Sequence, residues 1–119
     1  LERNKKGGDI FSLSIQELVK ITKQAEDKGI NRMHPNELNY IQQLLRFLVL
    51  SFIFYFDEPV ITDLMKPYFE LEDDENFENS ILGHLIDSLK LCLSSKQLEI
   101  RKHALRCLQV ILLNDQVKT

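Results

Sequence analysis

In this chain of 119 residues, the side chains best suited to metal binding or catalysis are the cysteines and two of the histidines. His103 and Cys107 are four residues apart and share one face of a helix, while His84 and Cys92 lie in the preceding apolar segment. Imidazoles and thiolates are zinc ligands. However, eight residues separate His84 from Cys92, no carboxylate is placed to orient an imidazole, and cysteine is commonly a plain buried apolar residue. We therefore expect no metal site and no disulfide.

A second candidate for chemistry is the run of six carboxylates between Glu70 and Glu78. This run lacks the spacing and the glycine of an EF-hand, and an exposed segment lacks the dry pocket that separates the pKa values of an acid and a base. Serines are scattered, Gly7 and Gly8 precede no strand, and close packing in an apolar helix explains Gly83. We expect no catalytic residues and no cofactor, and so a non-enzymatic protein.

The composition fits one folded domain with a core, because 44% of the residues are apolar. Lys and Arg number 15 against 18 Asp and Glu, which gives a net charge of −3. Two cysteines are too few for a disulfide framework and no secretion signal opens the chain, so the sequence predicts a cytoplasmic or nuclear protein. The start at Leu1 rather than methionine indicates a piece of a longer protein.

Apolar residues recur at intervals of three and four, which predicts an all-α fold. Ser14 and Glu17 have the spacing of a capping box, so a first helix should begin near Ile15 and end at Gly29. Pro35 should open a second helix and Pro59 a short third one. Two more helices are expected on either side of a short break at residues 94–96, as antiparallel neighbours.

These elements predict a simple domain organisation. Residues 1–9 have too little apolar surface to order themselves and should form a flexible tail. Residues 10–119 should form one helical domain. Within it, residues 70–79 should be an acidic loop between two halves, because like charges at this density repel one another.

The stretch from Leu44 to Phe56 is apolar almost all round, since only Arg46 and Ser51 interrupt it. Its 13 residues are too few to span a bilayer, which needs about 20. The pattern favours a central core helix that is nearly enclosed. The alternative is a surface that a partner, or the rest of a larger protein, normally covers.

Residues 80–114 resemble a HEAT repeat, a helical hairpin that stacks into solenoids. The second helix carries Ile100-Arg101, then Ala104, Leu108 and Ile111, which is similar to the Val-Arg-x-x-Ala-x-x-x-Leu pattern of that family. The resemblance implies antiparallel hairpins stacked as a short HEAT- or armadillo-like solenoid, with Arg101 paired to an acid in a turn. Here Ser94, Ser95 and Lys96 stand where the family often has Asp and Pro.

The first half of the chain shows no repeated letters with the second half. A second repeat at residues 15–56 therefore rests on helix spacing alone. The three-helix armadillo type is equally open there.

A repeat unit needs neighbours to cover both of its faces, so we expect a protein-protein interaction scaffold that binds a partner helix or peptide. The expected apolar anchors, whichever are not internal, are Phe47, Phe52, Phe54 and Phe56. The expected charged rim is Lys96, Arg101, Lys102 and Arg106.

Two other functions are open. The basic last helix would suit a chromosome- or nucleic-acid-associated scaffold, although the acidic chain and the lack of stacking aromatics on that helix oppose a dedicated binder. A self-associating structural unit is the other.

Overall fold

A computed structural model describes residues 2–54, 59–69 and 74–118, with side chains placed within 10–54, 59, 61–66 and 75–112. Every regular element in these ranges is helical, which confirms the all-α prediction. The elements are α1 (Glu2–Lys28), the 3-10 helix η1 (Ile30–Arg32), α2 (Pro35–Phe54), α3 (Pro59–Phe69), α4 (Asp74–Asn79), α5 (Ile81–Cys92) and α6 (Leu98–Lys118).

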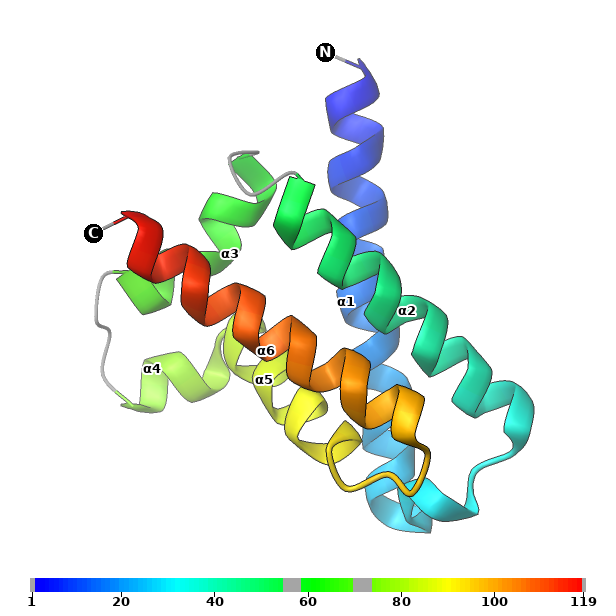
Figure 1. Cartoon of the computed structure of the whole chain (residues 1–119). Coiled ribbons are helices and arrows are strands. Elements are labelled where there is room, and N and C mark those ends of the chain that lie inside the picture. Colours follow the sequence, from blue (N-terminus) through cyan, green and yellow to red (C-terminus); the bar gives the residue numbers. More distant parts are fainter. Residues whose placement is uncertain (1, 55–58, 70–73, 119) are drawn as a thin grey trace.

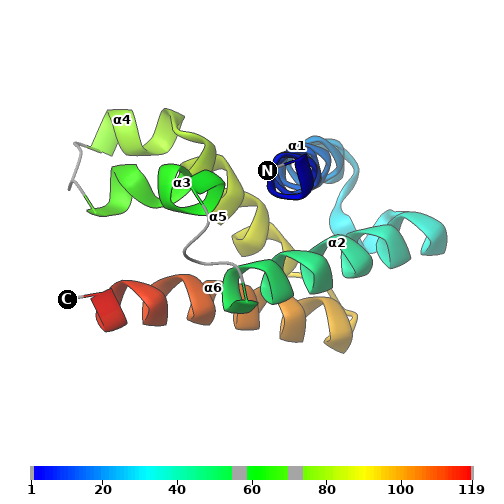
Figure 2. The same cartoon turned by 90° about the horizontal axis from the view of Figure 1, so that it is seen from above.

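Two helical hairpins, α1 with α2 and α5 with α6, lie side by side in two layers. Helix α1 packs on α5, and α2 packs on α6. Figure 1 shows that α2 and α6 run in the same direction, and Figure 2 shows them together beneath α1, α3 and α4. The short helices α3 and α4 connect the two hairpins and pack against α5.

The first helices of the two hairpins each bury a run of residues with the same spacing, although the hairpins share no sequence pattern. Four of the buried positions of α1 are separated by three, four and three residues, and so are four of the buried positions of α5. The two sets are Ile15, Leu18, Thr22 and Ala25 in α1, and Leu82, Leu85, Leu89 and Cys92 in α5.

Polar bonds tie the hairpins together. The hydroxyl of Thr22 on α1 lies 2.8 Å from that of Ser88 on α5, in a buried hydrogen bond. The turns of the two hairpins also meet, because the backbone N–H of Lys96 donates to the Asn31 side-chain oxygen at 2.7 Å. These contacts join residues 66 and 65 positions apart, so they hold equivalent parts of the two hairpins side by side.

The prediction for the start of the first helix is wrong. Helix α1 begins at Glu2, so residues of the expected tail are helical and Ser14 lies inside the helix. The Ser14 hydroxyl donates to the carbonyl of Ile10 one turn earlier, at 2.8 Å, instead of capping a helix end. The buried face of α1 already starts at Phe11, whose ring meets Phe52 of α2 edge to face at a centroid distance of 5.5 Å.

The prediction of an acidic loop at residues 70–79 is also partly wrong. Residues 74–79 form α4, and 70–73 lie outside the described residues. The half-buried Phe77 packs against the core and explains why this charged segment folds onto α5. Helix α3 continues through Pro67 to Phe69.

Several helix boundaries lie where the local sequence predicts them. Gly29 ends α1 with a φ of 88°, in the region that favours glycine, and its N–H donates to the Ala25 carbonyl. Pro35 is the first residue of α2. The break at 94–96 separates α5 from α6 as expected.

The start of α2 also carries a cap that the sequence analysis missed. The His34 N–H donates to Glu37, and Nδ1 of His34 accepts from the Asn36 N–H.

Candidate interaction surface

Helix α2 is covered on one side only, so the prediction that it is nearly enclosed is wrong. Its outward side exposes Tyr40, Phe47 and Phe54, which follow one another at intervals of seven residues, together with Leu50 and Ile53. Phe54 is 70% exposed. The all-round apolar composition of α2 is therefore not explained by burial, and the alternative of a surface that awaits a partner gains support.

Helix α6, which packs on α2, presents a second apolar row. Leu98, Leu105 and Leu112 also recur every seven residues, so they form one line along the helix, and each is about half exposed or more. The opposite side of α6, at Ile100, Ala104, Cys107 and Ile111, faces the core. We call the outward sides of α2 and α6 together the α2/α6 face.

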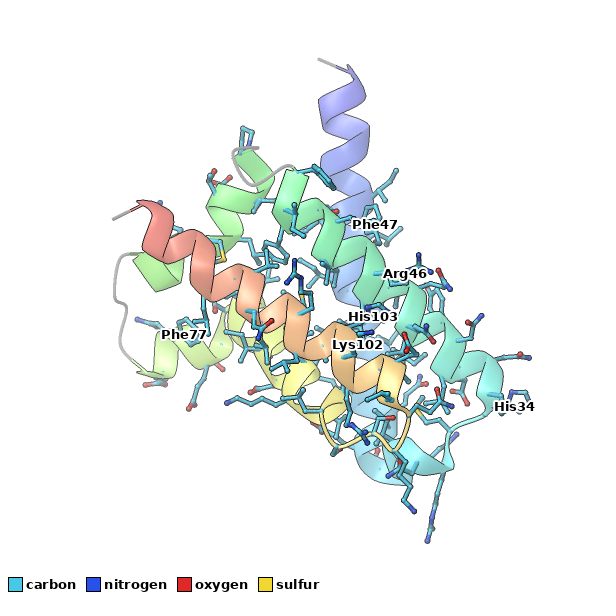
Figure 3. The ribbon with its side chains drawn as sticks, viewed as in Figure 1. His34, Arg46, Phe47, Phe77, Lys102 and His103 are labelled. Carbon is cyan, nitrogen blue, oxygen red and sulfur yellow. The ribbon has the colours of Figure 1, made fainter. Side chains whose placement is uncertain are left out.

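The exposed charges on the α2/α6 face are mainly positive. Among the described residues of the two helices, the exposed Asp, Glu, Lys and Arg side chains are Arg46, Lys102, Arg106 and Glu99. The Glu99 carboxylate lies 3.7 Å from the imidazole of His103, one turn along. Figure 3 labels Arg46 on α2 and Lys102 and His103 on α6, the two helices nearest the viewer. This excess of positive charge contrasts with the net charge of −3 of the whole chain.

The expected aromatic anchors have different positions. Phe47 and Phe54 lie on the α2/α6 face. Phe52 is fully buried against Phe11 and is internal, which removes it from the candidates. Phe56 lies outside the described residues.

The expected cations also separate into two groups. Lys102 and Arg106 are exposed on α6, while Lys96 lies at the α5–α6 turn. Arg101 is half-buried, and its guanidinium donates to the carbonyls of Ser95 at 2.9 Å and Lys96 at 3.4 Å. These turn carbonyls occupy the place of the acid that the family resemblance implied for Arg101.

Sequence reasoning missed Tyr40, Arg46, Leu50 and Ile53 on α2 and the three leucines Leu98, Leu105 and Leu112 on α6. The seven-residue spacing of the three leucines was the available signal. It was hidden because the inward residues of α6 also recur at three and four, so two apolar stripes coexist on one helix.

The cysteines and histidines are not assembled into a metal site. Cys92 and Cys107 are free and buried, and burial raises the pKa of each thiol to about 12. Nearby Cys92 adds to the shift at Cys107. Within the described part of the chain, three or more His, Cys, Asp or Glu side chains nowhere gather closely enough to hold a metal ion.

The described helices are all too short or too polar to cross a bilayer. Comparisons of the chain with protein-family models, curated proteins and solved structures give no match.

Proposed function

We propose that this chain is a non-enzymatic interaction module of the helical-repeat type, and that its α2/α6 face binds an amphipathic helix with acidic side chains. One observation carries the proposal: two adjacent helices expose parallel apolar rows, with three cations and one carboxylate among them. Many exposed apolar side chains on neighbouring helices are typical of an interaction site.

The architecture supports a HEAT- or armadillo-like solenoid unit. Side-by-side hairpins with first helices in one layer and second helices in the other are the arrangement expected of stacked repeats. The equal spacing of buried residues in α1 and α5 agrees with this. The two free thiols suit a reducing compartment such as the cytoplasm or nucleus.

The two kinds of side chain on this face would do different work. Exposed Phe54, Leu50 and Leu105 offer apolar area, and its removal from water supplies most of the binding free energy. Arg46, Lys102 and Arg106 would select for acidic partners and against basic ones. A basic side chain of a partner placed against one of these cations is repelled, and that repulsion costs more binding free energy than a matched pair of opposite charges gains.

The test is to select binders from a display library of amphipathic helices whose polar positions are randomised. We expect the selected helices to be enriched in Asp and Glu. The double substitution Lys102→Glu with Arg106→Glu should weaken them at least 10-fold, since two matched pairs become repulsive.

A matched control carries the same change in net charge elsewhere. Lys28 and Arg32 are exposed near the end of α1, so Lys28→Glu with Arg32→Glu should alter affinity less than 3-fold. Equal loss in both double variants, binders without acidic enrichment, or no binders at all would contradict the proposal.

A second candidate is nucleic-acid binding, which Arg46 favours by joining Lys102 and Arg106 on one face. With three phosphate contacts, the logarithm of the DNA association constant should fall against the logarithm of the salt concentration with a slope of about −2.7. This slope corresponds to roughly a 40-fold loss of duplex affinity between 50 and 200 mM salt. Apolar capture of a helix should change far less over the same range. A fluorescent DNA duplex and a selected helix, titrated in parallel, separate the two functions.

A further inference from the structure

A groove lies along α1 on the other layer of the molecule. Two hollows of about 370 and 350 Å³ adjoin there and share Ile15, Gln16 and Ile81. The described residues that line them come from α1, α3 and α5, and none comes from α2 or α6. The groove is therefore separate from the α2/α6 face.

The apolar wall of the groove is held in place by the corner between α4 and α5. Ile81 is the first residue of α5 and is 61% exposed. The preceding Ser80 hydroxyl accepts from the Gly83 N–H and donates to the Phe77 carbonyl. A side chain at Gly83 would collide with the carbonyls of Phe77 and Glu78, so glycine lets α4 pack closely here. The Ser80 hydrogen bonds and the close packing at Gly83 therefore fix the start of α5, and with it the position of the exposed Ile81 in the groove.

The charges of the groove are opposite at its two ends. Exposed Lys20 and Lys23 line one hollow, and exposed Asp63 lines the other. Between them the lining is chiefly apolar, with Phe11 and Ile15 buried in the floor. An occupant should therefore be negative at one end, apolar in the middle and positive at the other.

The helical walls favour a helix over an extended peptide. The backbone groups of α1, α3 and α5 are paired inside those helices, so an extended chain would find few partners for its own N–H and C=O groups. A helix satisfies its backbone internally and brings apolar side chains at i, i+3, i+4 and i+7. Each hollow is larger than an engineered cavity of about 150 Å³ that holds benzene, so each has room for a large apolar side chain.

We infer that this groove binds a second amphipathic helix, about three turns long, that runs antiparallel to α1. The groove follows α1 from Ser12 to Lys23, about 17 Å at 1.5 Å per residue. Helices favour acids in the first turn and bases in the last. Such a helix meets Lys20 and Lys23 with its acidic start and Asp63 with its basic end only in the antiparallel direction. The chain would then hold two helical segments, one on each layer.

The test uses a fluorescent 14-residue helical peptide with Glu in its first turn, Leu at i, i+4 and i+7, and Lys in its last turn. Its affinity for the full chain is measured by anisotropy. A second peptide has the two charged ends exchanged and should bind roughly 10-fold more weakly. A third has a central proline that prevents the helix and should lose binding.

Two variants of the chain locate the site. Ile81→Asp should weaken the peptide at least 10-fold, because a carboxylate replaces the exposed apolar wall. An acidic residue in the first turn suits α5, so this variant should fold, as its thermal melt would show. Leu105→Asp on the α2/α6 face should leave the peptide affinity within 2-fold.

The inference is contradicted if the exchanged or proline peptide binds as well as the first, if Ile81→Asp has no effect, or if the first peptide does not bind. Equal sensitivity to Leu105→Asp would place the peptide on the α2/α6 face and would likewise contradict it. The proposed function is tested by other substitutions, so either proposal can fail without the other.

Discussion

At the scale of single residues, similar side chains have opposite fates according to what surrounds them. Phe52 and Phe54 are two positions apart in the same apolar stretch, yet Phe52 is fully buried and Phe54 is 70% exposed. Arg101 pairs with turn carbonyls, whereas Arg106, five residues later, is exposed. The chemistry of a residue type therefore says little here until its place on a helix is known.

The two thiols allow a prediction at this scale. Because the pKa of Cys92 and Cys107 is about 12 in the folded protein, neither should react with a disulfide reagent at pH 8 until the chain unfolds. Absorbance should report two thiols in guanidinium chloride and none in buffer. Complete reaction of the folded protein within minutes would contradict the burial of these thiols.

The same shift makes stability depend on pH. Above about pH 9 the unfolded chain releases thiol protons that the folded chain keeps, so the free energy of unfolding should fall as pH rises. The limiting slope is about 1.4 kcal/mol per pH unit for each thiol. Denaturant titrations of the wild type and of the Cys92→Ala variant between pH 8 and pH 10 measure the difference in slope.

At the scale of elements, a buried polar pair helps to align the first helix of each hairpin. The Thr22 hydroxyl bonds to that of Ser88 and also lies 2.8 Å from the Leu18 carbonyl. Both residues are buried in a seam that is otherwise apolar. A pair of this kind restricts how α1 can slide along α5, because any shift leaves a hydroxyl without its partner.

We predict that Thr22→Val lowers the free energy of unfolding by about 1–2 kcal/mol, since it leaves the Ser88 hydroxyl buried without this bond. Ser88→Ala in the same background should cost less than it does alone, with a coupling energy of about 1 kcal/mol. Urea denaturation of the four proteins in the cycle measures this. Ser14→Ala, which loses only a bond within α1, is the control and should cost less than about 0.5 kcal/mol. Simple additivity of Thr22→Val and Ser88→Ala would argue against the pair.

At the scale of the whole molecule, each hairpin supplies the cover that the other lacks. Helix α1 packs on α5 and α2 packs on α6, so the buried residues of each hairpin meet those of the other within each layer. A single helical hairpin of this size buries too little surface to be stable by itself. The outward sides that remain are the α2/α6 face and the groove along α1.

We expect that residues 1–58 alone, which include α1, η1 and α2, show no cooperative thermal transition by circular dichroism, whereas the full chain does. Mixing this fragment with residues 59–119 should restore the transition, because the apolar faces of the two hairpins are complementary. A sharp melt of fragment 1–58 by itself would show that the hairpins are independent and that the stacked arrangement is not what stabilises them.

The sequence alone determined the helical class and those helix ends that depend on local chemistry. Gly29, Pro35 and the polar break at 94–96 act through their own backbone geometry and their nearest neighbours, so they could be recognised without a fold. The tertiary structure alone decided which side of each helix faces outward, because burial depends on segments that are distant along the chain. Ser14 lies inside α1 because the buried apolar face of this helix begins earlier, at Phe11. The groove exists only because α3 and α5 lie beside α1, and no periodicity within one helix encodes that neighbourhood.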